Sequence, residues 1–386
     1  VLPLTRSAGI SGATAIGIDA AHGEYVAFMG HDDMLSPAAL QDVVDIISRD
    51  QPDILYTDET AFSDLDEKND LGYFGTPRFK PDFSPDLLLS HNYITHLLVV
   101  RKSLIDNVGG PNSEFDGAQD YEFLLRLTER TDKVAHVPKP LYHCRQSTRS
   151  TSLDTTAMPQ AHSKAALALE QALSRRRVKG EVLTANAPQY FRVRRDITGC
   201  PLVSVIIPFR DEPRLLQRSI SAVLERTNYS NIEILGVDNG SVDELTFDIK
   251  DRFETTSDQV SFHSYDRPFN FSELVNFGVS QAHGSHVVLM NNDIEVINGD
   301  WLSCMLEHSQ RHEIGAVGGK LYYPDDTIQH AGIVVGIGGY AGHSHKHKPG
   351  GDRGYLNRLN IIQNVSAVTG ALLMCKKSVF EKIGGF

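Results

Sequence analysis

One internal repeat constrains this sequence more than any other feature. Residues 11–32 align with residues 272–293 at a constant offset of 261 and without a gap. Both copies show helical spacing, then a short apolar run, then an aspartate, Asp32 in the first copy and Asp293 in the second. Identical residues occupy the aligned pairs Ser11/Ser272, Gly17/Gly278, Ala21/Ala282, His22/His283, Gly23/Gly284, Val26/Val287, Met29/Met290 and Asp32/Asp293. A repeat of helix, strand and terminal carboxylate indicates two copies of one domain.

A second pair of similar segments lies further along each copy. Residues 368–378 (VTGALLMCKKS) echo residues 94–103 (ITHLLVVRKS), and both segments lead into a Gly-Gly pair. Because Gly385 of the second pair aligns with Gly110 of the first, the offset there is 385 − 110 = 275. The second copy therefore carries an insertion of 275 − 261 = 14 residues between its two repeated segments.

The repeats and a change of composition divide the chain into three parts. We expect residues 1–153 to be the C-terminal part of a first domain, and residues 201–386 to be the N-terminal and central part of a second. Residues 154–200 combine an alanine- and leucine-rich helical pattern with an alternating segment, which predicts a helical and hairpin linker. Since the chain starts at Val1 and stops within the second copy, we expect it to be a piece of a longer polypeptide.

Composition and charge exclude several classes of protein. With 386 residues, 41% hydrophobic, the chain can build two cores, and its formal net charge of −12 argues against nucleic-acid binding. No run reaches the roughly 18 apolar residues of a membrane span, and the four cysteines form no C-x-x-C pair, which favours free thiols. We therefore expect a cytoplasmic protein, peripheral at most at the inner face of the cell membrane. Two basic clusters could touch such a membrane, but a solvated protein face is the favoured interpretation of Arg175, Arg176, Arg177, Lys179, Arg192, Arg194 and Arg195.

A nucleotide-binding pattern opens the second domain. Residues 202–207 form an apolar run, a helical segment follows from Pro213, and residues 232–237 form another apolar run. Two strands separated by a helix, with polar and glycine residues after each strand, are typical of a nucleotide-binding βαβ unit. The chain is therefore predicted to be α/β, with a Rossmann-like, mostly parallel sheet. Its ligand would bind at the carboxyl ends of the strands, where Pro208, Phe209 and Arg210 would flank the base.

Several ordered motifs connect nearly the whole chain to one known family. In the second domain they are PLVSVIIPFRDE, GVDNGSVDE, FNFSELVNFGVSQAHG, VVLMNNDIEV, IQHAGIVVG and VTGALLMCKKSVFEKIGGF. In the first domain they are GHDDML, DILYTDE, FKPDFSPDLLLSHNYITHLLVV and GAQDYEFLL. At this order and spacing they resemble the family 2 inverting glycosyltransferases of GT-A fold. The tandem arrangement resembles large bacterial enzymes that build cell-surface polysaccharides.

The resemblance implies two tandem copies of the GT-A nucleotide-diphospho-sugar transferase fold, both incomplete. It implies transfer of a sugar from a nucleotide-diphosphate donor to a growing glycan, or to a lipid-linked glycan, with inversion of the anomeric centre. It also implies a divalent cation, Mg²⁺ or Mn²⁺, because a hard cation neutralises the leaving pyrophosphate. The fragment alone is expected to be inactive, because one copy lacks its donor half and the other its catalytic base.

The resemblance places the metal at the aspartates that end the repeated strands. Asp32 and Asp293 occupy the position of the last aspartate of the family's D-x-D motif. The first aspartate of that motif is replaced by Gly30 in one copy and by Asn291 in the other, so each site has lost a charge. Asp33 is a candidate to compensate in the first copy, and Glu295 a weaker one in the second. The alternative is that Asp32 and Asp293 only cap the turn that follows.

The catalytic base implied by the resemblance is Asp120, in the segment GAQDYE. It matches the second member of the family's pair of acidic residues, and Gln119 stands in place of the first. A carboxylate at the start of a helix suits the removal of a proton from the acceptor hydroxyl. The alternative is that Asp120 is simply the N-cap of that helix.

Further candidate contacts to the nucleotide sugar come mostly from the second domain. Asp238 resembles the family's nucleotide-contacting aspartate, although the DNGS segment is also an ordinary turn. His330 matches a family position near the active site, where a hydrogen-bonded structural histidine is the alternative. Three more histidines alternate nearby, either as a metal site or as part of a mobile loop: His343, His345 and His347. The candidate nucleotide-sugar contacts are then Pro208, Phe209, Arg210, Asp238, Asn239, Asn276, Asn292 and His330.

Two other classes of function stay open beside glycosyl transfer. A nucleotidyltransferase also combines a nucleotide-binding sheet with acidic metal ligands, but its expected glycine-rich phosphate loop is missing from PFRDEPR. A degenerate module that binds glycans or serves as a scaffold without catalysis is supported by the lost aspartate in each copy. A narrower alternative is that only one copy is active in the whole protein.

Overall fold

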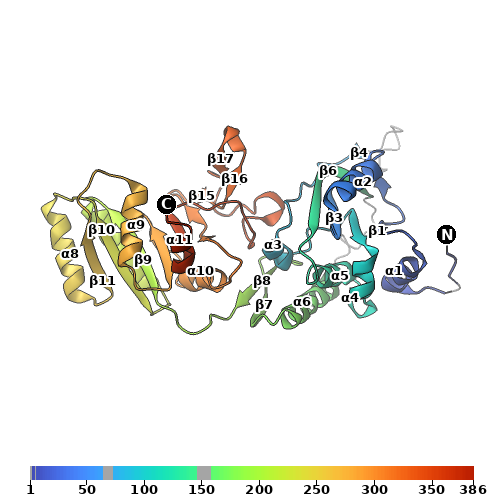
Figure 1. Ribbon diagram of the computed structural model, residues 1–386, viewed down its shortest axis with the longest axis horizontal. Coiled ribbons are helices and arrows are strands. Elements are labelled where there is room, and N and C mark those ends of the chain that lie inside the picture. Colours follow the sequence, from blue (N-terminus) through green and yellow to red (C-terminus); the bar gives the residue numbers. More distant parts are fainter. Residues whose placement is uncertain (1, 5, 64–72, 146–157) are drawn as a thin grey trace. The chain divides into compact units, whose positions relative to one another are not determined.

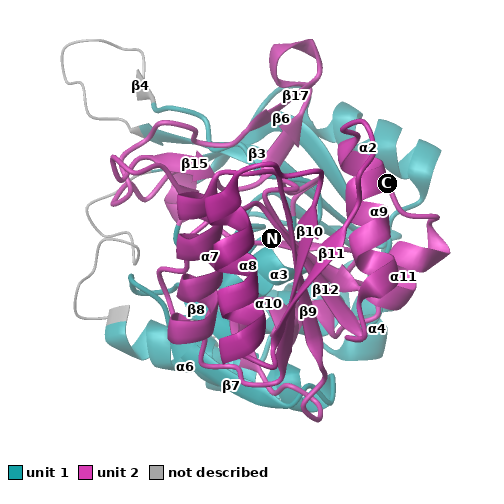
Figure 2. Ribbon diagram, turned by 90° about the vertical axis from the view of Figure 1, so that its left-hand side faces the viewer, with its two compact units in different colours: residues 1–193, 360–364 teal, residues 194–359, 365–386 magenta. Residues whose placement is uncertain are grey.

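The structure is a computed structural model that describes residues 2–4, 6–63, 73–145 and 158–386. The chain divides into two compact units, coloured separately in Figure 2. The first unit comprises residues 1–193 and 360–364, and the second comprises residues 194–359 and 365–386. No helix of the described residues is long and apolar enough to cross a membrane. Part of the long loop expected over residues 62–86 lies outside the described residues.

The second unit is built on one mixed sheet. Its strand order is β11-β10-β9-β12-β18-β13, in which the first four strands are parallel and β18 runs antiparallel to both of its neighbours. The strands are β9 (Val203–Phe209), β10 (Ile232–Asp238), β11 (Val260–Ser264), β12 (His286–Met290), β13 (Val317–Gly318) and β18 (Leu372–Lys376). Small antiparallel pairs follow in the β12–β18 connection: β14 (Leu321–Tyr322) with β15 (Ile328–His330), and β16 (Ile333–Val335) with β17 (Ala341–His343).

Helices cover both faces of this sheet, which makes a three-layer unit (Figure 2). The alternating side chains of β9 show why: Val205 and Ile207 join the cluster with three helices on one face, whereas Ile206 joins the cluster on the other. The first face carries α7 (Pro213–Arg226), α8 (Glu244–Thr256) and α10 (Trp301–Ser309). The other face carries α9 (Phe271–Gln281) and α11 (Lys377–Lys382). Nearly continuous apolar strands buried on both faces are characteristic of parallel sheets.

The strand order creates a switch point beside β9. Strand β9 pairs with β10 on one side and with β12 on the other, both in parallel. The chain therefore leaves the carboxyl ends of these neighbouring strands in opposite directions, which opens the edge where α/β sheets bind ligands. Phe209, Asp238 and Met290 are the last residues of the three strands.

The first unit contains a sheet of order β1-β5-β3-β6-β2, with β4 paired to β3. Only β3 and β6 are parallel. The strands are β1 (Tyr25–Phe28), β2 (Met34–Leu35), β3 (Ile54–Ser63), β4 (Tyr73–Phe74), β5 (Leu98–Arg101) and β6 (Val134–Arg145). The helices are α1 (Gly9–Ala20), α2 (Ala39–Asp50), α3 (Pro85–Ser90), α4 (Lys102–Val108), α5 (Gln119–Leu127) and α6 (Met158–Arg175). The two strand-like pieces expected within residues 135–144 form the single strand β6.

The helix and hairpin expected within residues 154–200 are both present. Helix α6 packs its alanines and leucines into the core that α5 and η1 (Ser113–Phe115) share, and the hairpin consists of β7 (Gly180–Thr184) and β8 (Phe191–Arg195). Residues 158–193 therefore belong to the compact first unit, and the second unit begins after Val193 (Figure 2).

The repeated segments pair in the same way in both units. In the first unit β1 pairs antiparallel with β5, with Val26 opposite Val100. In the second unit β12 pairs antiparallel with β18, with Val287 opposite Cys375. The offsets are 287 − 26 = 261 and 375 − 100 = 275, which are the two offsets found in the sequence. The inserted residues therefore lie wholly between two strands whose register is unchanged.

Candidate functional site

The edge at the switch point of the second unit is held by two loops that are tied together. The backbone N–H of Asp211 donates to Ser241 Oγ at 2.7 Å, and Asp211 Oδ1 accepts from the N–H groups of Val242 and Asp243 at 2.7 and 2.9 Å. The loop after β9 and the loop after β10 are therefore fixed relative to each other. The sequence analysis missed Asp211, because nothing in its local pattern shows a partner 30 residues away.

The three residues expected to flank a base lie in different environments. Phe209 is buried in the core and packs edge-on against Phe262, with ring centroids 5.8 Å apart. Pro208 is half-buried and Arg210 is exposed. Only Pro208 and Arg210 therefore present side-chain surface at this edge.

Asp238 is occupied by protein partners. One carboxylate oxygen lies 2.7 Å from Lys250 Nζ and the other accepts from the backbone N–H of Ser241 at 2.8 Å. Burial works to raise the pKa of Asp238, but the hydrogen bonds from Lys250 and Ser241 outweigh it and lower that pKa below its ordinary value. The carboxylate is 5% exposed. Asp238 thus stabilises the loop after β10 through contacts inside the protein.

Asn239 lies beside Asp238 and is also buried. Its Nδ2 donates to the carbonyl oxygens of Tyr265 and Arg267 at 2.9 and 2.8 Å. Its Oδ1 is buried without a hydrogen-bond partner among the described residues. An unsatisfied buried acceptor of this kind costs free energy in the isolated protein.

Asp293 is the free acid at this edge. It follows β12, is exposed, and its carboxylate has no hydrogen bond within the described ranges of the chain. The backbone of Asn291 donates to the carbonyl of Ala371 at 3.0 Å, which fixes the start of the loop, and Asn292 is half-buried. Glu295, the weaker candidate to replace the lost charge, forms an ion pair with Arg218 instead. The turn-capping alternative for Asp293 therefore has no hydrogen bond to support it.

Two other expected contacts have protein partners. The Asn276 amide exchanges two hydrogen bonds of 3.0 Å with the backbone of Phe386. His330 is 1% exposed, and its Nε2 accepts from the N–H groups of Gly332 and Thr369 at 3.3 and 3.4 Å. Burial and the neighbouring His343 lower the pKa of His330 to about 4, so the ring is neutral at physiological pH. This arrangement is that of a structural histidine.

The three alternating histidines do not share one face. His343 Nδ1 lies 3.1 Å from His330 Nδ1, His345 Nε2 accepts from the N–H of Tyr355, and His347 stacks on Tyr323. His345 and His347 both have positive φ, so the extended conformation that would align them is not adopted. Across the described residues, no group of three histidine, cysteine or acidic side chains converges as a metal site would require.

In the first unit the two neighbouring aspartates face different surroundings. Asp33 Oδ2 accepts from Tyr142 and Oδ1 accepts from the backbone N–H of Arg145 at 2.8 Å, so both oxygens are engaged. The Asp32 side chain is 42% exposed, and its ion pair among the described residues is with the solvent-exposed His31, at 3.7 Å. Asp32 is therefore the carboxylate with room for a ligand, and Asp33 is a poor substitute for the missing charge at Gly30.

Asp120 lies in the first turn of α5, but it is not the cap of that helix. The N-cap position is Ala118, and the helix starts at Gln119, whose Nε2 donates to Asp120 Oδ2 at 3.2 Å. Asp120 is solvent-accessible, yet enough protein surrounds its carboxyl that burial raises the pKa, against the effects of His96 and Gln119. The N-cap alternative is therefore wrong, and a raised pKa suits a general base.

A buried ion pair lies under this part of the first unit. Lys80 Nζ is 3.1 Å from Glu59 Oε2, and the two side chains are 3% and 7% exposed. Thr95 donates to the same Glu59 oxygen at 2.7 Å, and Lys80 also donates to the carbonyl of His96. The His96 ring stacks on Tyr142 with centroids 4.7 Å apart. The pair thus supports His96, whose ring has charge interactions with both Asp33 and Asp120.

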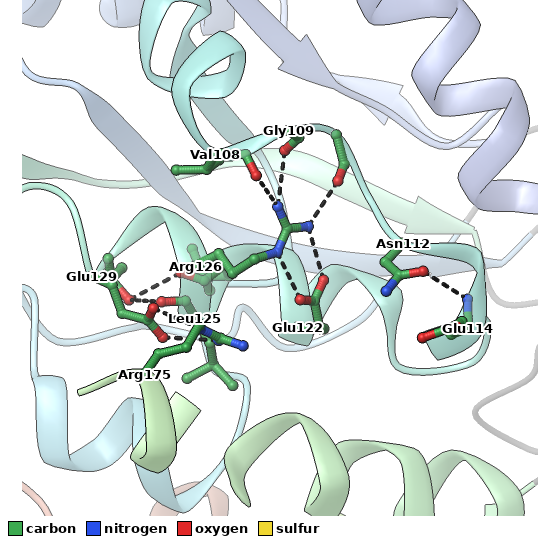
Figure 3. Close-up of polar contacts among 12 residues, drawn as sticks. Val108, Gly109, Asn112, Glu114, Glu122, Leu125, Arg126, Glu129 and Arg175 are labelled. Carbon is green, nitrogen blue, oxygen red and sulfur yellow. Dashed lines mark hydrogen bonds and ion pairs between the residues drawn. The ribbon is translucent and has the colours of Figure 1, made fainter. Parts of the chain in front are cut away.

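The first basic cluster, for which the sequence favoured a solvated face over membrane contact, is partly used inside the first unit. Arg175 forms two hydrogen bonds with Glu129, at 2.8 and 2.9 Å, and Arg176 lies 3.6 Å from the same carboxylate. Figure 3 shows this contact beside a second one, in which Arg126 binds Glu122 and the carbonyl oxygens at the end of α4. These arginines therefore stabilise helix packing rather than form a free cationic surface.

The fold and the edge together define a class. A mostly parallel sheet with a switch point, two interlocked loops after its first strands and a free carboxylate after the next strand is typical of α/β domains that bind a ligand at this edge. The family model "Glycosyl transferase family 2" matches residues 1–109 and 204–384. The chain belongs to this family, and the expected α/β class with the GT-A fold is confirmed.

Two similar proteins cover the whole chain. The uncharacterized protein y4gI of Sinorhizobium fredii is 42% identical over 381 residues, which are 97% of this chain and 41% of that protein. The O-antigen biosynthesis protein RfbC of Myxococcus xanthus is 37% identical over 388 residues, which are 100% of this chain and 30% of that protein. The chain thus spans less than half the length of either relative. A solved structure, a mannosyltransferase from Pyrobaculum calidifontis, matches 60% of this chain at 21% identity with a TM-score of 0.37.

Proposed function

We propose that the protein transfers a sugar from a nucleotide-diphosphate donor to a growing glycan, with inversion and with a divalent cation. The observation that carries the proposal is Asp293, the free carboxylate beyond β12 at the switch-point edge of a family 2 domain. The O-antigen biosynthesis named for the Myxococcus xanthus relative supports a glycan acceptor. A lipid-linked glycan at the inner face of the cell membrane is the acceptor that this proposal favours.

Each unit carries a different part of the family's site. The second unit contributes the parallel strands β9, β10 and β11, at whose ends a nucleotide would bind. The first unit contributes Asp120 on α5, beyond the strands that correspond to β12 and β18. We therefore assign donor recognition to the second unit and proton abstraction to the first, each acting within its own complete copy of the domain in the whole protein.

Asp120 is the proposed base for inversion. Its carboxylate would accept the proton of the acceptor hydroxyl as that oxygen attacks the anomeric carbon from the face opposite the leaving pyrophosphate. The raised pKa of Asp120 increases its basicity, and Gln119 holds one carboxylate oxygen in place at 3.2 Å. The other oxygen is left to face the acceptor.

Asp293 and Asp32 are the proposed metal ligands of the two copies. Mg²⁺ binds through one or two carboxylates and takes its other ligands from phosphates and water, so a single free carboxylate fits this chemistry. When bound, the cation would neutralise the pyrophosphate that leaves. The protein's part is to hold the carboxylate at the end of the strand, which the Asn291–Ala371 hydrogen bond does for Asp293.

Calorimetry of the second unit's donor site tests the metal assignment. We expect the Mn²⁺-dependent affinity for UDP or GDP to weaken by at least about tenfold in Asp293→Ala, which corresponds to about 1.4 kcal/mol. Glu295→Gln is the matched control, because this acid is two residues away and already pairs with Arg218. Equal affinities in the wild type and in Asp293→Ala would remove Asp293 from the site.

Transfer by the full-length polypeptide tests Asp120. We expect Asp120→Asn to keep donor binding and to lose transfer by the first copy by about 100-fold or more, the range typical of a general base. Glu114→Gln, an exposed acid close in sequence, is the control and should transfer normally. Normal transfer by Asp120→Asn would exclude it as the base.

A non-catalytic glycan-binding or scaffold module is the second candidate. Its support is that Asp33 is turned to Tyr142 and Arg145, so nothing in the first copy replaces the acid missing at Gly30. In that case the full-length polypeptide would bind glycan or nucleotide without any turnover, and Asp120→Asn would leave every measured property unchanged.

A further inference from the structure

The hairpin of β16 and β17 is an isolated element of the second unit. Apart from one bridge between Ile333 and Ala367, its two strands pair with each other within the described residues, with Val334 opposite Gly342 and Val335 opposite Ala341. Figure 1 shows the hairpin, in orange, projecting from the rest of the unit. A lone two-stranded hairpin is marginally stable in water, so its projection requires an explanation.

The tip of this hairpin exposes apolar side chains. Residues 334–341 are all exposed, and they include Val335 (66%), Ile337 (50%) and Tyr340 (88%). The glycines between them confirm how open the tip is, because a Cβ added at Gly336, Gly338 or Gly339 would meet nothing within 4 Å. Single exposed apolar residues are ordinary, whereas a contiguous group of them marks a contact surface.

The stem of the hairpin is fixed, in contrast to its bare tip. The backbone N–H of Ile333 donates to Ala367 at 2.9 Å, and that of Ser344 donates to Gly332 at 2.9 Å. His343, the last residue of β17, packs edge-on against the buried His330, with ring centroids 4.9 Å apart. The tip is therefore presented by an anchored stem.

The charge around the hairpin has the opposite sign to that of the chain. Residues 320–358 contain five lysines and arginines against the three aspartates Asp325, Asp326 and Asp352, a net charge of 5 − 3 = +2, although the whole chain has a formal net charge of −12. Lys346 and Lys348 follow the second strand and are both exposed. Among the described residues, Lys348 pairs with Asp352 at a long 3.9 Å, and Lys346 has no ion pair. A cationic segment therefore lies directly behind the apolar tip.

We propose that this hairpin is a membrane-contact element whose tip enters the interface of an anionic bilayer. Aliphatic side chains partition into the acyl boundary, tyrosine favours the headgroup level, and lysines behind them meet anionic lipid. A second copy of the chain is a less suitable occupant, because two such cationic segments would repel each other. The hairpin would bring the protein to the membrane that holds a lipid-linked acceptor, and in this respect the inference rests on the proposed function.

Vesicle sedimentation tests the proposal without any sugar transfer. The chain is mixed with vesicles of equal parts phosphatidylcholine and phosphatidylglycerol, or of phosphatidylcholine alone, and the bound fraction is measured. We expect binding to the anionic vesicles only. The double variant Val335→Ser/Ile337→Ser should weaken this binding by about tenfold or more, and Lys346→Gln by about fivefold.

The matched control is Leu40→Ser/Val44→Ser on helix α2, because these side chains are exposed to similar extents of 63% and 53%. This control should bind as the wild type does. Absence of vesicle binding, or equal binding by the hairpin variant and the control, would overturn the proposal. Concentration-dependent dimers abolished by the hairpin variant would overturn it too, in favour of self-association. Loss of the proposed transferase activity with vesicle binding intact would leave the membrane contact standing.

Discussion

Replacing Lys80 by methionine should destabilise the first unit by about 3–4 kcal/mol, at the low end of the cost of breaking a buried ion pair, because Arg78 still lies 3.5 Å from the other oxygen of Glu59. Methionine retains the packing of the lysine stem, so the loss comes mainly from the charge. Glu59 would keep the hydroxyl of Thr95 at 2.7 Å but lose its closest cation, while 7% of its side chain is exposed. The expected loss of stability is large because Glu59 is buried, so water cannot replace the ammonium group of Lys80.

The assay is urea unfolding followed by two probes. Circular dichroism reports both units, whereas the single tryptophan of the chain, Trp301, lies in the second unit and reports that unit alone. With a urea m-value of about 2 kcal/mol/M, the substitution should lower the midpoint of the first unit by about 2 M. The Trp301 transition should not move. Lys139→Met, which breaks an exposed pair with Asp42, should cost less than about 1 kcal/mol.

The double variant Lys80→Met/Glu59→Gln decides whether the reasoning is correct. It removes both charges, so it should recover most of the lost stability. The pH dependence gives a second check. The lowered pKa of Glu59 in the folded wild type means that its contribution is present above the unfolded value of about 4.3 and is lost as pH falls through the folded value. A cost below about 1 kcal/mol, or no recovery in the double variant, would refute the argument.

Three further outcomes are expected from single substitutions. Gly278→Ala should destabilise the second unit by about 1–3 kcal/mol, because the new Cβ would lie 2.6 Å from Ile206 Cγ2. The aligned Gly17→Ala should instead stabilise the first unit by up to about 1 kcal/mol, since nothing lies within 4 Å of its Cβ position in a helix. Asp238→Asn should cost about 1–3 kcal/mol through the loss of its charge-assisted bond to Lys250. Because the pKa of Asp238 is lowered, this difference should be largest at neutral pH and vanish as pH falls through the folded value. The midpoints of urea unfolding measure all three changes in stability. The clearest check would be a lowered midpoint for Gly278→Ala together with a raised midpoint for Gly17→Ala.

Local patterns in the sequence were sufficient to predict much of the fold. Helix α7 starts at Pro213 and ends at Arg226, as expected from the proline and the apolar spacing. The position of Asp293 after β12 follows from the length of an apolar run, and the structure finds no hydrogen bond to its carboxylate among the described residues. Features that depend on a few neighbouring residues could therefore be predicted from the sequence.

Contacts between residues far apart in the sequence could not be predicted in this way. Tyr142 reaches Asp33 across 109 residues because β2 pairs with β6, and Lys80 reaches Glu59 across 21 because Arg78 forms a bridge with Glu59 on β3. No periodic pattern encodes which strand neighbours which. Phe209 was expected to flank a base and is instead in the core, because alternation along β9 places it on the face that α7 and α8 cover.

The register of β12 with β18 has a consequence for how such domains can diverge. The long connection between these strands begins and ends at one point, because Asn291 donates to Ala371 at 3.0 Å. Closing a loop becomes only logarithmically harder with length, so the 14 additional residues of the second copy add about 0.2 kcal/mol to the closure entropy. The connection between β12 and β18 can therefore gain new hairpins at almost no cost in loop-closure entropy. Two descendants of one ancestral domain can keep the same sheet while acquiring different surfaces.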